Sequence, residues 1–210
     1  MTEEDLTTDG RRMGKRGRQT RLLLLKSLVA ELGASGHRDT TVMNVARRVK
    51  TSPATFYQYF PDVDLALLAL AQDVARAGDA NSAPTKPTSH QDDPHRADVS
   101  EALQTFFALY DEHRVVLRVI DMKSAEGDRR FTELRSHFLG RLHAELSRAA
   151  QTAHPAAPAH AVASKVAPLV LMLAEVAAHD RELEAWTSDA EEVRANAAEL
   201  VHTTIATLTE

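Results

Sequence analysis

The chain has 210 residues, which suits one large domain or two small ones, and 43% of them are hydrophobic. It contains no cysteine, which excludes disulfides and thiolate chemistry, and no uninterrupted apolar run has the length of a bilayer span. The first ten residues are acidic and polar, so we expect no secretory signal and a cytoplasmic location. Because alanine and leucine dominate the apolar residues and strand-type alternation is absent, the sequence predicts an all-α fold.

The net charge of −5 is distributed unevenly along the chain. Residues 10–60 carry a local charge of +9, whereas residues 1–9 carry −4 and residues 61–210 carry −10. A basic segment joined to an acidic body suggests a module that binds a polyanion. A solvated charged face explains the charge pattern equally well, so charge alone leaves both interpretations open.

The first part of the chain predicts a basic arm followed by helices. Residues 1–20 end in a basic stretch that contains glycine and lacks periodicity, so we expect a flexible arm. Thr40 or Thr41 would cap the second helix, and Ser52 followed by Pro53 would begin the third. The helices predicted from apolar periodicity cover residues 22–33, 41–49, 53–60 and 63–77.

The rest of the chain predicts a loop and a helical body. Residues 78–98 are polar and contain three prolines, which is typical of a loop. Helical stripes resume at Val99, and the last two long apolar helices are expected at 161–180 and 188–208. The predicted organisation is an arm over 1–20, a helix-turn-helix over 21–64 and a helical body over 65–210 that includes the 78–98 loop.

Four of the ten aromatic residues fall within residues 56–60, in the second helix of the predicted helix-turn-helix. Phe56 and Phe60 are four positions apart, so they share a face and are expected to pack on the preceding helices. Tyr57 and Tyr59 point elsewhere, with hydroxyls suited to phosphate oxygens, and Ser52 at the helix start offers a further phosphate site. The residues left to face base edges are Pro53, Ala54, Thr55 and Gln58.

The segment TTVMNVARRVKTSPATFYQYFPDVDLALLAL, residues 40–70, resembles the TetR family of transcriptional regulators. It carries T-V-x-x-[apolar]-A followed by S-x-x-[TS]-[apolar]-Y-x-[YH]-F. The resemblance implies an N-terminal three-helix helix-turn-helix DNA-binding domain and a C-terminal helical domain for ligand binding and dimerisation. It implies phosphate contacts by Thr41, Ser52, Tyr57 and Tyr59, and base contacts near Val42, Pro53, Ala54, Thr55 and Gln58.

Two positions depart from the family pattern. Lys50 stands in the turn, where glycine is usual, and Val63 stands where a lysine is usual, between two acidic residues. Lys50, Arg47, Arg48 or the basic arm, which contains Arg16 and Arg18, could compensate for the missing lysine. The arm could enter a minor groove or be disordered without consequence, but we expect it to attract the DNA backbone without sequence preference.

In the helical body, the resemblance implies an effector pocket and a homodimer formed by the last two helices. Dimerisation is also needed because one short helix reads too few bases for useful specificity. Aromatic and flexible apolar residues of the central helices are the pocket candidates, with plain core as the alternative for each, and they favour a lipophilic effector. The candidates, with two polar anchors last, are Phe106, Phe107, Tyr110, Ile120, Phe138, Met172, Glu175 and His179.

We therefore predict a repressor that is released from a palindromic DNA operator by a small effector, without a cofactor. The ten histidines are scattered and lack metal-ligand spacing, so no metal site is expected. One alternative is a small helical enzyme, although the chain lacks a nucleophile elbow and a phosphate-binding glycine loop. The other is a DNA-binding protein that works without an effector, which would show steep salt dependence and little sequence preference.

Overall fold

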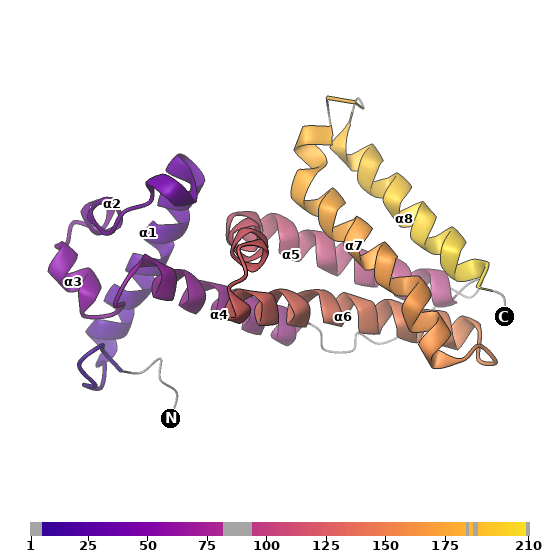
Figure 1. Cartoon of the computed structure of the whole chain (residues 1–210), viewed down its shortest axis with the longest axis horizontal. Coiled ribbons are helices and arrows are strands. Elements are labelled where there is room, and N and C mark those ends of the chain that lie inside the picture. The colour runs from indigo at the N-terminus through magenta and orange to yellow at the C-terminus, as the bar shows by residue number, and fades with distance from the viewer. Residues whose placement is uncertain (1–5, 82–93, 184, 187–188, 209–210) are drawn as a thin grey trace. The chain divides into compact units, whose positions relative to one another are not determined.

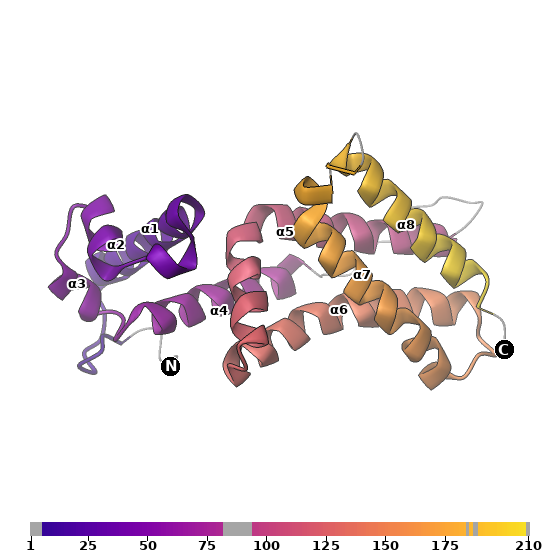
Figure 2. The same ribbon diagram turned by 45° about the horizontal axis from the view of Figure 1, so that its top comes forward.

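The computed structural model describes residues 6–81, 94–183, 185–186 and 189–208. Within them the chain forms eight α-helices and one isolated antiparallel bridge (Figures 1 and 2), which confirms the predicted all-α class. The helices are α1 (Lys15–Asp39), α2 (Val42–Arg48), α3 (Pro53–Tyr57), α4 (Val63–Asn81), α5 (Pro94–Ala125), α6 (Arg129–Ala153), α7 (Ala159–Leu183) and α8 (Ala190–Ala206).

Contacts between residues divide the chain into two compact units. The first unit contains Met1–Val74 and Val115–Thr132, and the second contains Ala75–Arg114 and Glu133–Glu210. This division differs from the predicted boundary at residue 64, because the first part of α4 and the second part of α5 group with α1–α3. Helices α4 and α5 therefore each contribute residues to both units.

Helix α1 is longer than the sequence predicts. It begins at Lys15 rather than at residue 22, so the last part of the predicted flexible arm is helical. Lysine, arginine and glutamine are good helix formers, and their charge does not prevent a helix here. The helix also continues through Gly33 and bends at Gly36, whose φ of 75° is a conformation that glycine adopts without strain. Residues 1–5 of the predicted arm lie outside the described residues.

Side-chain caps fix the starts of α2 and α3. The Thr41 hydroxyl accepts a hydrogen bond from the Asn44 N–H at 3.2 Å. The Ser52 hydroxyl accepts one from the Thr55 N–H at 3.2 Å, as predicted. Thr40, the other candidate cap for α2, instead donates its hydroxyl to a carbonyl at the end of α1. The two helices therefore begin where the sequence places them.

Helix α3 ends at Tyr57, three residues earlier than predicted. The N–H groups of Tyr59 and Phe60 both donate to the Phe56 carbonyl, at 2.9 and 3.0 Å, so a tight turn replaces the last helical turn. Pro61 follows, and a proline disfavours helical dihedrals in the residue before it.

A small apolar core supports α3. Leu24 of α1, Val45 of α2 and Phe56 of α3 are completely buried, and Phe60 is 3% exposed. The prediction that Phe56 and Phe60 pack inward is confirmed. The buried Ser27 hydroxyl donates to the Val45 carbonyl at 2.8 Å and ties α1 to α2.

The two acidic residues at the start of α4 have structural partners. An Asp62 carboxylate oxygen accepts the Leu65 N–H at 2.7 Å, which caps α4. An Asp64 carboxylate oxygen lies 3.1 Å from Lys123 Nζ and 3.7 Å from His37 Nε2, so it links α4 to the ends of α5 and α1. The two carboxylates that flank Val63 thus make contacts inside the first unit.

The second unit is a helical body in which α7 and α8 run side by side in opposite directions (Figures 1 and 2). Helix α4 extends to Asn81 and α5 begins at Pro94, so the predicted 78–98 loop is helical at both ends. Its residues 82–93 lie outside the described residues. Helix α5 is kinked at His113, next to the point where the chain passes from one unit to the other.

Aromatic rings of α5 and α6 form a cluster inside the second unit. The rings of Phe106 and Phe138 stack with centroids 5.6 Å apart, and Tyr110 lies 5.8 and 6.3 Å from them. All three side chains are buried. The Phe107 ring makes an edge contact with Phe106 at the border of the cluster. The Arg194 guanidinium carbon lies 5.0 Å from the centroid of the Phe107 ring, in a cation–π contact.

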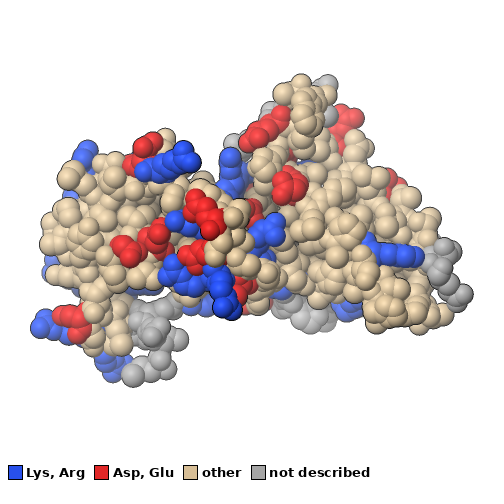
Figure 3. All heavy atoms as spheres, in the orientation of Figure 1, with Lys and Arg blue, Asp and Glu red and all other residues tan. Residues whose placement is uncertain are grey.

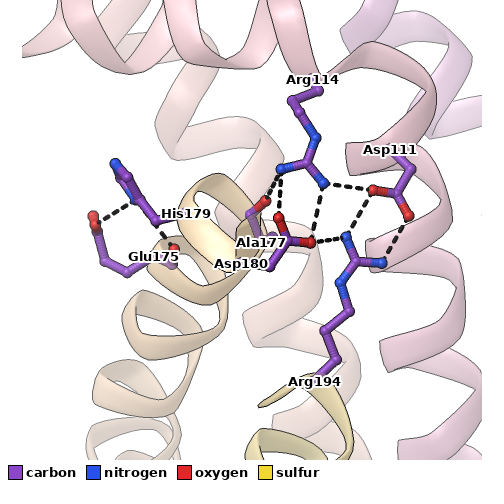
Figure 4. A network of polar contacts seen from close by, with 7 residues as sticks. All are labelled: Asp111, Arg114, Glu175, Ala177, His179, Asp180 and Arg194. Carbon is purple, nitrogen blue, oxygen red and sulfur yellow. Dashed lines mark hydrogen bonds and ion pairs between the residues drawn. The ribbon is translucent and has the colours of Figure 1, made fainter. Parts of the chain in front are cut away.

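An ionic network joins α5, α7 and α8 in the same unit (Figure 4). Arg114 of α5 donates to both oxygens of Asp180 of α7 at 2.8 and 3.1 Å and to the Ala177 carbonyl at 2.9 Å. Arg194 of α8 donates to Asp180 and, through two bonds of 2.7 Å, to Asp111 of α5. Two arginines and two aspartates thus neutralise one another, and the Asp180 side chain is 3% exposed.

By length and composition alone, α7 between Ala159 and Asp180 resembles a bilayer span, with a mean hydropathy of 1.7. The sequence has no uninterrupted apolar run of that length, so it does not predict a helix of this hydropathy. One such helix is weak evidence for a membrane, because a helix packed inside a helical domain has the same composition.

Candidate nucleic-acid interface

Helix α3 exposes the residues that the sequence assigns to base contacts. Pro53, Ala54 and Gln58 are exposed, and Thr55 is half-buried against the Ser52 hydroxyl. The α3 surface away from Phe56 therefore combines small apolar groups with one amide. An amide can form paired hydrogen bonds with adenine, and small apolar groups suit the thymine methyl.

The residues assigned to phosphate contacts surround this surface. Tyr57 is half-exposed and Tyr59 is half-buried, while Thr41 and Ser52 are exposed at the starts of α2 and α3, with Val42 half-buried beside Thr41. The cap bonds use lone pairs of the two hydroxyl oxygens, so the Thr41 hydroxyl still has a proton to donate to a phosphate oxygen. The Ser52 hydroxyl also lies 3.1 Å from the Thr55 hydroxyl, and either of these two can donate to the other.

The Lys50 backbone adopts a left-handed conformation, with a φ of 55°. It is the only non-glycine residue with a positive φ in the described part of the chain, and its side chain is exposed. The turn therefore keeps the backbone shape for which glycine is suited, at a cost of about 1 kcal/mol for a residue with a Cβ. In return the turn carries a positive charge between α2 and α3.

Replacing Lys50 with glycine is expected to raise the free energy of unfolding by about 0.5–1 kcal/mol, because the strain disappears. The same change should weaken DNA binding, because a cation is lost. Lys50→Ala is the matched control, since it removes the charge and keeps the strained backbone. Thermal unfolding and duplex titration of both variants test this, and equal stability of the two variants would contradict it.

The two arginines assigned to the arm have different surroundings. Arg16 lies on α1 and is exposed. Arg18 Nη1 donates to the Met13 carbonyl at 2.9 Å, so this guanidinium holds the segment before α1 in place. Arg21 lies 5.2 Å above the Phe60 ring, which places it against the core of the first unit.

Residues Leu6–Met13 form a compact turn, the N-terminal hook, that the sequence does not predict. Leu6 and Arg12 form an antiparallel bridge, and the Thr7 N–H donates to the Arg11 carbonyl at 2.9 Å. Gly10 turns the chain with a φ of 80°. No periodicity marks such a turn, although a glycine among polar residues is a turn signal.

In the second unit, Phe106 and Phe138 of the predicted effector site line one cavity of about 30 Å³, room for about one water molecule. Its polar lining residues are Thr105, Arg141 and Glu145, which the sequence does not predict. Arg141 and Glu145 lie four apart beside the apolar stripe of α6, a pattern that marks a polar edge of an apolar face. The remaining lining residues are Gly78, Ala102, Leu109 and Leu142.

The other predicted effector residues do not line this cavity. Phe107 lies under Arg194, and Tyr110 is buried in the aromatic cluster. Ile120 is buried in the first unit. Met172 and the ion pair of Glu175 with His179 (3.4 Å, Figure 4) lie on α7. Among the described residues, no group of three or more potential metal ligands is found.

Comparison with known proteins identifies the family. The family model for the tetracyclin repressor-like C-terminal domain matches residues 93–208, more than half of the chain. A comparison with curated protein sequences found no match. Solved structures with the same fold include a fatty acid degradation regulator, FadR, from Bacillus halodurans (TM-score 0.65, 13% identity, covering 91% of this chain and 96% of that chain).

Two further solved structures share the fold over more than nine tenths of the chain. A mutant of HlyIIR has a TM-score of 0.62 and 16% identity, covering 92% of this chain and 97% of that one. A TetR-family regulator from Syntrophomonas wolfei has a TM-score of 0.62 and 14% identity, covering 91% and 97%. The chain therefore belongs to the TetR family of transcriptional regulators, which are not enzymes.

Proposed function

We propose that the chain is a cytoplasmic repressor that binds a palindromic DNA operator as a homodimer and leaves it when a small amphipathic molecule binds. The observation that carries the proposal is the outer surface of α3. Ala54 and Gln58 are exposed there, while Phe56 and Phe60 anchor the same segment in the core. A short helix that is packed on the core by one side and exposes small apolar groups and an amide on the other suits the major groove.

The last two helices support a homodimer. Only 39% of the most apolar stretch of α7 is buried within the chain, and Leu171 is 52% exposed. Leu200 of α8 is 56% exposed. Exposed leucines on two neighbouring helices favour a self-complementary interface, in which each helix pair packs on its two-fold mate. Such a dimer would present two α3 helices to two half-sites.

The cavity between α5 and α6 is the proposed effector site. Its wall is apolar, with Phe106, Leu109 and Phe138, and its edge carries Arg141 and Glu145. This combination suits a molecule with an apolar body and a polar end. Because the cavity holds about one water molecule, an effector must separate the side chains that line it.

Release would follow from a shift between two arrangements of the protein. A ligand changes an equilibrium only by binding one arrangement more tightly than the other. An effector that binds only the opened cavity would favour the arrangement in which α5 and α6 are apart. Helices α4 and α5 contribute to both units, so their movement is the proposed route from the cavity to the DNA-binding unit.

The proposal is tested by titrating duplexes that the full chain selects from a random pool. Gln58→Ala should weaken binding to the selected duplex by about 5- to 150-fold, which corresponds to about 1–3 kcal/mol per base contact, and should hardly affect random duplexes. Tyr57→Phe should weaken both by a similar factor of about 3–10, because a phosphate contact carries no sequence information.

The same titrations give the outcomes that contradict the proposal. Equal losses for both variants on selected and random duplexes would show that the assigned roles of Gln58 and Tyr57 are wrong. Retention of no duplex by the unmodified chain at low salt would exclude DNA binding itself. The mass of the complex should correspond to two chains per selected duplex.

A further inference from the structure

The N-terminal hook is fastened to the end of the DNA-reading helix. The Thr8 N–H donates to the Gln58 carbonyl at 2.9 Å, and its hydroxyl lies 2.8 Å from the Tyr57 carbonyl and 3.2 Å from that of Gln58. These carbonyls follow the last turn of α3, where backbone oxygens lack helical partners. Thr8 therefore joins two segments that are about 50 residues apart in the sequence.

The other end of the hook is fixed to α1. Met13 is 5% exposed, and its carbonyl accepts the Arg18 guanidinium at 2.9 Å. Gly17 of α1 lies beside the Met13 side chain and the Tyr59 hydroxyl, and a Cβ placed on it would lie 3.4 and 3.6 Å from them, at ordinary contact distance. The hook is thus held at both ends.

An open groove of about 500 Å³ lies between the hook and α3. One side is formed by Ala54, Tyr57 and Gln58, which belong to the proposed DNA-contacting surface. The other side is formed by the hook and the residues that follow it, namely Thr7, Thr8, Asp9, Arg11, Arg12, Met13, Gly14 and Gly17. The groove is therefore continuous with the surface proposed to read bases.

The two arginines of the hook, Arg11 and Arg12, differ in their ion pairs. Arg11 Nε lies 3.2 Å from an Asp9 carboxylate oxygen, so these charges offset each other; Figure 3 shows acidic and basic atoms together on the hook, at the lower left. Arg12 is exposed and forms no ion pair with any residue that the structure describes. Arg12 thus remains as a cation at the groove, beside Tyr57.

We propose that the hook and α3 form a preformed seat for one sugar-phosphate strand of duplex DNA, in which Arg12 binds a phosphate and Thr8 positions Arg12. This inference rests on the proposed function and assigns a tethered element where the sequence predicts only a flexible arm. The strand at the edge of the major groove is the occupant, because the hook is attached beside the residues that face the bases. A guanidinium binds phosphate through two N–H groups, and a tethered arm loses little conformational freedom on binding.

The test compares Arg12→Ala, Thr8→Val, Thr8→Ser and the Thr8→Val/Arg12→Ala double variant on the selected duplex. Arg12→Ala should lower affinity about 3- to 10-fold and reduce the salt slope by about one per bound chain. Thr8→Val keeps the shape of the side chain but removes its hydroxyl, and should lower affinity about 3-fold. Thr8→Ser should bind like the unmodified chain, because the hydroxyl is restored.

The double variant shows whether Thr8 acts by positioning Arg12 or by a general effect on the stability of the protein. If Thr8 acts by placing Arg12, adding Thr8→Val to Arg12→Ala should cause no further loss. A full additional loss in the double variant, or unchanged affinity for Thr8→Val alone, would overturn the proposal. Arg148→Ala is the matched control, because it removes one exposed positive charge from α6 in the second unit.

These outcomes are distinct from those for the proposed function. If Gln58→Ala relaxes base preference while the hook variants bind normally, the repressor assignment stands and the seat is wrong. If the unmodified chain holds no duplex, both are wrong. Thermal unfolding of each hook variant shows whether a loss of binding reflects a loss of folding.

Discussion

The Phe56→Ala variant is expected to lose about 3–5 kcal/mol of unfolding free energy in the first unit and to release DNA as a result. The Phe56 ring is completely buried, and its centroid lies 5.5 Å from that of Phe60 and 5.9 Å from that of Tyr57. Helix α3 has only five residues, so it cannot persist without tertiary contacts. A cavity at this point removes the support for the whole reading surface.

Tyr57→Ala is the matched control for this prediction. It removes a ring of similar size from the next position, but that ring is half-exposed, so the expected loss is only about 1 kcal/mol. Urea unfolding gives the free energies, and amide hydrogen exchange should be faster in α1–α3 of Phe56→Ala but unchanged in α7 and α8. Similar losses for the two variants would show that Phe56 is not the anchor of α3.

Local signals are sufficient to predict the starts of α2 and α3. The caps at Thr41 and Ser52, the proline at the start of α3 and the spacing of Phe56 and Phe60 act within one or two helical turns. Such features depend on neighbours in the sequence, and a pattern of residue types can therefore reveal them. The sequence does not predict the start of α1, because a basic stretch with glycines resembles a flexible arm even though lysine, arginine and glutamine are good helix formers.

Features that depend on distant partners were not predictable. The Thr8 tether to the end of α3 joins residues that no local pattern connects. In the proposed effector cavity, aromatic character predicts Phe106 and Phe138 but does not predict Arg141. Its position at the cavity is decided by the packing of α6 on α5. Helix-to-helix orientation is set by many contacts together, and single-sequence periodicity does not contain it.

The second large effect on the free energy of unfolding is expected in the ionic network of the second unit. Asp180→Asn should lower the free energy of unfolding by about 2–4 kcal/mol at neutral pH, because Arg114 and Arg194 would share only Asp111. The Arg114 and Arg194 side chains are 15% and 21% exposed, so water offsets part of the lost interaction. Glu175→Gln is the matched control on α7, since it removes an exposed carboxylate and should cost less than about 1 kcal/mol.

The contribution of Asp111 to the free energy of unfolding should decrease at acid pH. Hydrogen bonds from Arg194 first, and then from Arg114, lower the pKa of Asp111 from 3.8 to about 2. A carboxyl group whose pKa is lower in the folded state stabilises the protein above its unfolded pKa, and this contribution disappears as the pH falls from about 4 towards 2. The stability difference between the unmodified chain and Asp111→Asn should therefore be constant from pH 7 to pH 5 and shrink below pH 4. A difference that stays constant down to pH 2.5 would mean that the Asp111 carboxylate does not stabilise the junction of α5 with α8, and urea titrations at each pH decide between the two results.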